Sequence, residues 1–355
     1  MLPDTNAKTT PAPAVKPIKP YQILIPIVLG LAVIVWLFSS EFDIADLSSA
    51  SFTSLSVVFI LVAFILMFLR DATMMCRFRL LSDKRISWKQ AFVINVLSEF
   101  TSTVTPTAIG GSSLVVFFLA KEGVEAGRST TIMLVNLFLD ELFFVALCPL
   151  LFLLLPLQVL FPPSAGMATF GYVFIGLYAL HLVWAALLFV GIFIRPDWVK
   201  SILVLLFRLP FIRRWKHKMT TITDNLVQAS RDIKHRSPLF WLKALLLTFV
   251  TWSVRFLVVN AIFLAFVPVA DHLVLYARQI ILWVFMGAMP TPGGSGMSEL
   301  AFKQYYGDIC SSGSIVLLVT LIWRLASYYL YLFLGIFIIP RWLHEAIGKL
   351  GMPRA

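Results

Sequence analysis

The chain has 355 residues, of which 59% are hydrophobic and only 13% are charged. Soluble domains average about 25% charged residues, so this composition excludes a water-soluble fold. The formal net charge is +11, but most lysines and arginines lie between apolar runs, which argues against a nucleic-acid partner. Repeated apolar runs of about 20 residues, the length that an α-helix needs to cross a bilayer, predict an all-α polytopic membrane protein.

Residues 1–20 are rich in proline, threonine and lysine, and we expect them to form a disordered cytoplasmic tail. Residues 21–345 are predicted to form a single transmembrane domain. The first apolar run is too long for a signal-peptide core and has no clean cleavage site, so we interpret it as a retained helix. We expect about six full spans, at the apolar windows 22–39, 53–70, 129–155, 169–194, 239–267 and 314–339.

The charges between these windows predict the orientation of the chain. Basic residues dominate the tail, residues 70–90, the linker 195–238 and the C-terminus, whereas the loop 40–52 contains acids but no bases. Lysine and arginine favour the cytoplasmic side of a membrane, so both termini are expected in the cytoplasm. We expect the membrane to be a bacterial inner membrane. This orientation requires residues 91–120 and 279–310 each to cross an even number of times. Their halves are too short to span, which predicts two re-entrant hairpins that enter from opposite sides.

Each predicted hairpin has a tip rich in proline and glycine. The surrounding units, 53–155 and 239–339, both consist of helix, hairpin and helix, in opposite predicted orientations. This pattern is the inverted repeat of many secondary transporters, whose substrates bind near the bilayer midplane. The tip residues are Thr105, Pro106, Gly110, Gly111 and Ser112 in the first hairpin, and Thr291, Pro292, Gly293, Gly294 and Ser295 in the second.

The tips suggest an anion-binding site. The prolines are expected to end the incoming half-helices, the glycines to allow tight bends, and Ser112 and Ser295 to cap the outgoing half-helices. Free amides and the positive end of a helix dipole would then face a phosphate head group. A water-filled cavity is implied unless protein buries both tips. The alternative is that these small residues only pack helices together.

Ionisable residues inside spans are costly and usually face a cavity or one another. Asp140, Glu141, Arg255 and Arg324 are the four that we single out. Two interpretations remain open: a structural pair between one of these arginines and one of these acids, or arginines that bind phosphate with carboxylates as counter-ions or proton carriers. Glu299 follows the second tip, where it stabilises a helix dipole, contacts a cationic head group or carries a proton.

Glu99, on the incoming half of the first hairpin, has the same alternatives as Glu299. No catalytic residues, metal or cofactor are expected. The three cysteines show no CxxC or Cys/His spacing. His181 has no evident partner for catalysis.

The segment "MPTPGGSGMSEL" resembles the PTPGGxGxxE signature of the lysylphosphatidylglycerol synthase transmembrane-domain family. "TPTAIGGSSLVVFFLAKEG" is similar to the first motif of that family and "LIWRLASYYLYLFLG" to its last helix, over about residues 22–340 in all. The resemblance implies that the chain is like the flippase-like domain of multiple peptide resistance factors and dimerises. The implied motif residues are Gly110, Gly111, Gly293, Gly294, Gly296 and Glu299.

We therefore expect a flippase or translocase that moves an anionic or aminoacylated phospholipid, or a polyprenyl-linked lipid, by alternating access. The chain ends about 15 residues after its last predicted helix, so no synthase domain and no aminoacyl transfer are expected. One alternative is a non-transporting scaffold or regulator of a lipid- or glycan-modifying enzyme. Another is a membrane-embedded enzyme that modifies lipids.

Overall fold

The computed structural model describes residues 35, 39, 53–105, 108–161, 167–198, 201, 225, 227–269, 271–310 and 312–349. The predicted tail, nearly all of the first apolar window and most of the basic linker lie outside these residues. The described elements are helices: α2 (Ser54–Leu81), α3 (Trp88–Val104), α4 (Ala108–Lys121), α5 (Ala126–Leu154), α6 (Leu157–Leu160), α7 (Met167–Phe189), the π-helix η3 (Val190–Ile194), α10 (Pro238–Leu264), α11 (His272–Gly287), α12 (Met297–Tyr306), α13 (Gly313–Arg324), the π-helix η5 (Leu325–Tyr329) and α14 (Leu330–Lys349).

Five helical stretches are long and apolar enough to cross a bilayer. Their outward faces carry large apolar side chains, including Phe68, which is 73% exposed, and Leu153, which is 83% exposed. Surfaces of this kind are stable when lipid covers them. The all-α polytopic class is therefore confirmed, and the chain is a multi-pass membrane protein. The five stretches are Ser54–Leu81, Ala126–Leu154, Phe170–Ile194, Pro238–Leu264 and Gly313–Ile339.

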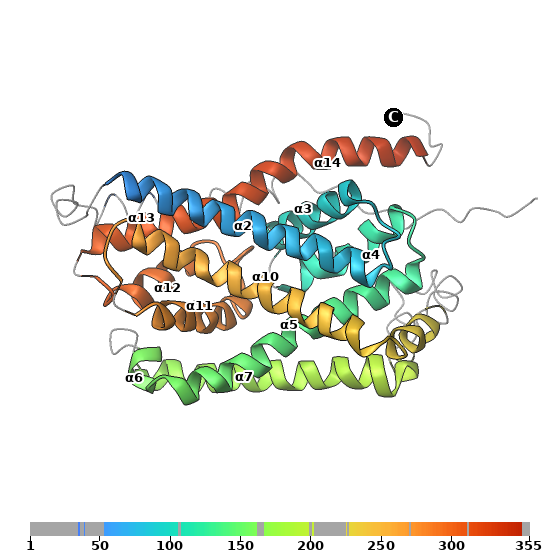
Figure 1. Ribbon diagram of the computed structural model, residues 1–355, viewed down its shortest axis with the longest axis horizontal. Helices are drawn as coiled ribbons and strands as arrows, with labels where there is room; N and C mark the ends of the chain where they lie inside the picture. The colour runs from blue at the N-terminus through green and yellow to red at the C-terminus, as the bar shows by residue number, and fades with distance from the viewer. Residues whose placement is uncertain are drawn as a thin grey trace, which may run out of the picture.

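Helices α2 and α10 form the centre of the fold. They run antiparallel and pack against each other along their length, with α5 and α7 on one side and α13 to α14 on the other (Figure 1). The start of α10 follows from local sequence, since Pro238 occupies the first turn and the Ser237 hydroxyl accepts a hydrogen bond from the Phe240 amide. The central pair gives both hairpins a common surface on which to pack.

Helices α3 and α4 form one hairpin, and α11 and α12 form another. In Figure 1 the first hairpin lies in the half of the molecule where α2 ends, and the second lies in the half where α2 begins. This arrangement is the one that hairpins entering from opposite sides require. The inverted repeat and the domain limits remain predictions.

The first hairpin differs from its predicted form at its turn. Helix α3 ends at Val104, with Thr105 as its C-cap, as a proline at 106 favours. Pro106 itself lies outside the described residues. Helix α4 begins at Ala108, so the following glycines and serine are helical. The predictions of a bend at Gly110 and Gly111 and of a helix cap at Ser112 are therefore wrong: the turn is shorter than the glycine pattern suggests.

The second hairpin also differs from its prediction. Helix α11 ends at Gly287, well before Pro292, so this proline does not terminate it. The N-cap of α12 is Gly296 rather than Ser295, and it provides no side-chain cap. Gly296 has a φ of 83°, a left-handed conformation that a residue with a Cβ adopts only with strain. Chain direction at this tip is therefore set by glycine backbone conformation instead of by a serine cap.

Away from its tip, the second hairpin is held together by Arg278 of α11. Its guanidinium donates to both carboxylate oxygens of Asp308, at 2.5 and 2.8 Å. It also donates to the carbonyl of Tyr305 at 3.1 Å and to that of Val159 at 2.8 Å. One buried arginine thus joins α11, α12 and the segment containing α6.

Candidate functional site at the hairpin tips

The second tip is a turn whose backbone groups bind one another. Gly293, Gly294 and Gly296 all have left-handed conformations, with φ of 57°, 68° and 83°. The amide of Gly294 donates to the Thr291 carbonyl at 2.9 Å, and that of Ser298 to the Gly294 carbonyl at 2.8 Å. These amides, expected to be free for an anion, are used within the turn. The hydroxyl of Thr291 is buried without a hydrogen-bond partner among the described residues.

The two hairpins meet at the centre of the molecule. A Cβ added to Gly293 would overlap the ring of Tyr328 and would lie 3.0 Å from the carbonyl oxygen and 3.2 Å from the Cα of Thr103. Thr103 is one residue before the end of α3, so the second tip contacts the first hairpin next to the tip of the first hairpin. The Thr105 hydroxyl is not free to bind a ligand at this contact, because its Oγ1 donates to the Thr101 carbonyl at 2.6 Å. Only a residue without a side chain fits at 293.

Arg324 binds the second tip rather than the first half of the protein. Its Nε donates to Glu299 at 2.7 Å, its Nη2 lies 3.5 Å from the Gly293 carbonyl, and its guanidinium stacks 3.9 Å from the centre of the Tyr328 ring. The other Glu299 oxygen accepts from the Ser298 hydroxyl at 2.9 Å. Arg324 is 2% exposed and Glu299 is fully buried. A buried ion pair of this kind holds the tip to the last long helix.

A second ionic cluster joins the first hairpin to the central helices. One oxygen of Glu99 accepts from Arg70, and the other lies 3.5 Å from Arg255. Arg70 also donates to Asp71 at 2.8 Å, and Asp71 accepts from the Tyr331 hydroxyl at 2.9 Å. Helices α2, α3, α10 and α14 thus each contribute a charged or polar side chain to this cluster.

The predicted acids of α5 have other partners. Asp140 binds Arg77 at 2.6 Å and accepts from the Trp252 indole at 2.7 Å. Glu141 lies 2.5 Å from the Nδ1 of His181. The open interpretation that paired Arg324 or Arg255 with one of these acids is therefore wrong, and His181 has a partner in Glu141 that the sequence did not make evident.

The pairings differ from the prediction because α2 is longer than its apolar window. The helix continues to Leu81, so residues assigned to a cytoplasmic loop lie within it. Arg70 is 4% exposed and Arg77 is fully buried. The two arginines are seven residues apart, which places them on one helical face, and this spacing was the signal that a charge count overlooked.

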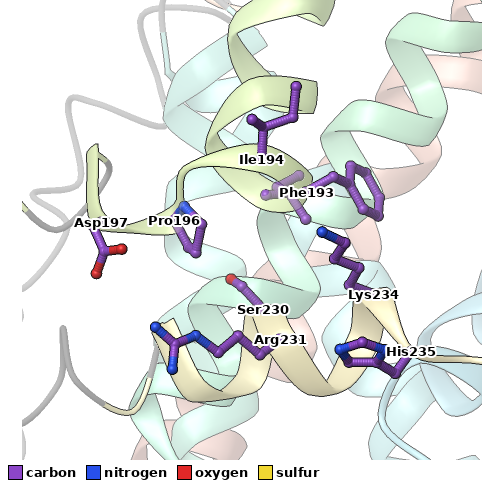
Figure 2. Close-up of a pocket in the computed structure, with 9 residues that line it drawn as sticks. Phe193, Ile194, Pro196, Asp197, Ser230, Arg231, Lys234 and His235 are labelled. Carbon is purple, nitrogen blue, oxygen red and sulfur yellow. The ribbon is translucent and has the colours of Figure 1, made fainter.

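The second tip is largely buried by protein in this conformation. Gly294, Ser295 and Gly296 are buried, as are Ser298 and Glu299. A cavity of about 280 Å³ lies elsewhere, at the basic end of the molecule, where α7 and η3 end (Figure 2). Its ionisable lining residues are Asp197, Arg231, Lys234 and His235. The second tip therefore fits the alternative that protein, rather than water, surrounds it.

Sequence similarity to known proteins extends over nearly the whole chain. The sequence profile of the lysylphosphatidylglycerol synthase TM region matches residues 23–335. A UPF0104 membrane protein of Archaeoglobus fulgidus is 27% identical over 327 residues, which cover 88% of this chain and 94% of that protein. The matched residues include both hairpins and all the buried ion pairs described above.

Proposed function

Because the chain belongs to the lysylphosphatidylglycerol synthase transmembrane-region family, we propose that it is a lipid flippase or a translocase of a lipid-linked precursor. The proposed substrate is an anionic or aminoacylated phospholipid, or a polyprenyl-linked lipid, whose head group passes between leaflets by alternating access. We further propose that the basic end of the molecule faces the cytoplasm of a bacterial cell and that the protein works as a homodimer.

The observation that carries this proposal is the contact between the two hairpins at Gly293 and Thr103. The hairpins lie in opposite halves of the molecule (Figure 1), and this contact joins them beside their tips. Moving either hairpin away would open that point to one end only. Alternating access in secondary transporters is largely the rocking or gating of one repeat against the other around a fixed site, and two hairpins that meet can act as such a gate.

The buried ion pairs provide the chemistry for a charged head group. Glu99 holds the first hairpin to α2 and α10, and Glu299 holds the second to Arg324. Separating either pair in a medium of low dielectric constant is costly unless another charge takes the place of the lost partner. A head group with its own negative charge can take that place. We therefore propose that substrate charge promotes hairpin movement.

Purified protein in liposomes tests the proposal. Vesicles containing fluorescent phosphatidylglycerol are treated with a membrane-impermeant quencher, which reaches only the outer leaflet. Vesicles with the protein should also lose the fluorescence of the inner leaflet, whereas empty vesicles should keep it. If neither this lipid, an aminoacylated form nor a polyprenyl phosphate crosses faster than in empty vesicles, a scaffold or regulatory role replaces transport. A change in lipid mass during incubation would instead indicate an enzyme.

A further inference from the structure

Arg70 and Arg255 converge on a single carboxylate. Each lies a little past the midpoint of its helix, in the antiparallel central pair α2 and α10. The two oxygens of Glu99 are shared between them, since Oε1 accepts from Arg70 and Oε2 lies 3.5 Å from Arg255. Two cations brought together by the fold thus share one monoanion that comes from the first hairpin.

Arg255 is the less firmly bound of the two arginines. Its contact with Glu99, at 3.5 Å, is at the limit of hydrogen-bonding distance. Arg70 has a second partner in Asp71, but Arg255 has no second carboxylate in the described part of the chain. Its guanidinium instead stacks 4.3 Å from the ring centre of Trp283. A buried cation with one distant counter-ion retains the capacity to bind another anion.

Asp71 is not free to take the place of Glu99. It accepts from Arg70 at 2.8 Å, from the Asn95 amide at 3.0 Å and from the Tyr331 hydroxyl at 2.9 Å. Those donors fix its carboxylate on the α3 and α14 side of Arg70. Glu99 is therefore the exchangeable anion of the cluster.

We propose that Arg70 and Arg255 form the binding site for the phosphodiester of the lipid head group, and that Glu99 occupies this site when no lipid is bound. A phosphodiester has one negative charge and two unbridged oxygens, as a carboxylate does, so exchange preserves the charge and the number of acceptors. The planar fork of arginine binds both groups. Asp71 already balances one of the two arginine charges, so a phosphomonoester at its second ionisation adds a charge for which the site has no further cation. The site therefore selects diesters over monoesters.

The exchange has a mechanical result because Glu99 belongs to α3. When the phosphodiester binds both arginines, the first hairpin loses its ionic attachment to α2 and α10. Glu99 is 14% exposed and the arginine side chains are 4% and 10% exposed, so the carboxylate is the most exposed of these three groups. Binding and release of the hairpin are then one event. This step deepens the proposed function by assigning its substrate class.

Equilibrium binding in detergent tests the site without requiring transport. Native mass spectrometry of the full chain is used to titrate phosphatidylglycerol, phosphatidic acid and inorganic phosphate. Glu99→Gln removes the competing charge and should tighten phosphatidylglycerol binding about tenfold, while Arg255→Gln should weaken it by a similar factor. Glu122→Gln is the matched control, because Glu122 contacts Gln90 and Trp342 at the far end of the same hairpin. Its affinity should equal that of the wild type.

Equal or weaker binding of phosphatidylglycerol by Glu99→Gln would overturn the inference. Phosphatidic acid binding tighter than phosphatidylglycerol would contradict the selection of diesters. If inorganic phosphate displaces the lipid and also gains affinity in Glu99→Gln, the lipid assignment is wrong. If Glu99→Gln does not fold, Glu99→Asp decides, because its shorter side chain weakens the contact with Arg255 and should also tighten binding. Tighter binding without movement between leaflets would reject the proposed function but keep the site, and transport with unchanged binding would do the reverse.

Discussion

Replacing Gly293 by alanine tests the contact between the two hairpins directly. The new methyl group would overlap the Tyr328 ring and press on the backbone of Thr103 at 3.0 Å. The ring has little room to move, because Tyr328 is 2% exposed and the Arg324 guanidinium stacks on it at 3.9 Å. The left-handed φ of 57° adds backbone strain.

Two separate terms determine the expected loss of stability. Placing a Cβ in the left-handed region costs about 1–2 kcal/mol, and overpacking a close contact costs about 1–3 kcal/mol. Gly293→Ala should therefore lower the free energy of unfolding by about 2–5 kcal/mol. Gly294 is the matched control, since its φ is 68° but its nearest neighbours would be at 3.6 Å. Gly294→Ala should show the strain term alone, about 1–2 kcal/mol.

Unfolding in mixed detergent micelles, followed by circular dichroism, measures these differences. Gly176→Ala provides a helical baseline, because nothing lies within 4 Å of its added Cβ. Since alanine favours a helix interior, this variant should be about 0.5–1 kcal/mol more stable than the wild type. If Gly293→Ala and Gly294→Ala lose the same stability, the hairpins are not in close contact at this point. In that case the proposed gate would lose its main structural support.

Three further predictions concern the charged and reactive residues. Arg77→Gln should destabilise the protein by about 3–5 kcal/mol in the same unfolding assay, because it leaves the partly buried Asp140 without its cation. A double variant with Asp140→Asn should recover part of this loss, and no recovery would refute the coupling. Asp308→Asn should cost only about 1 kcal/mol, because Arg278 keeps two carbonyl acceptors and Asp308 is 40% exposed, and a loss above about 3 kcal/mol would contradict this. Burial raises the pKa of the Cys310 thiol, which lowers its thiolate fraction at neutral pH. Labelling of Cys310 by an impermeant maleimide added outside intact cells should therefore accelerate as the pH rises. If the thiol is labelled from the cytoplasmic side alone, the proposed orientation is reversed.

Apolar length and charge placement were sufficient to predict most of the membrane helices. The reason is local: a span needs about 20 apolar residues, and a proline two residues beyond Val104 accounts for the end of α3. The same local reasoning failed for α2 after residue 70. Charged residues there resemble a loop in one dimension, but α3 and α5 supply the carboxylates that keep Arg70 and Arg77 inside the helix.

The ion pairs of the site were less predictable than its residues. Positions in apolar runs identify Arg255 and Arg324, and the place after the second tip identifies Glu299. All three are buried in the structure. Their partners depend on which helix faces come together, and no sequence spacing determines this. One of the two open interpretations paired Arg324 with an acid in the other half, yet Glu299 of the second hairpin is its partner. Burial was therefore predicted by composition, whereas pairing depended on tertiary packing.

The π-helical turn η5 changes how the last long helix transmits movement. Before η5 in the chain, α13 packs on α12. After it, α14 packs on α3, where Gly335 lets the Phe100 side chain approach the backbone. A π-turn interrupts the regular hydrogen-bond ladder of an α-helix and is one of the few places where a long helix can kink. One continuous helix therefore contacts both hairpins, and η5 is the point at which its two ends can differ in direction.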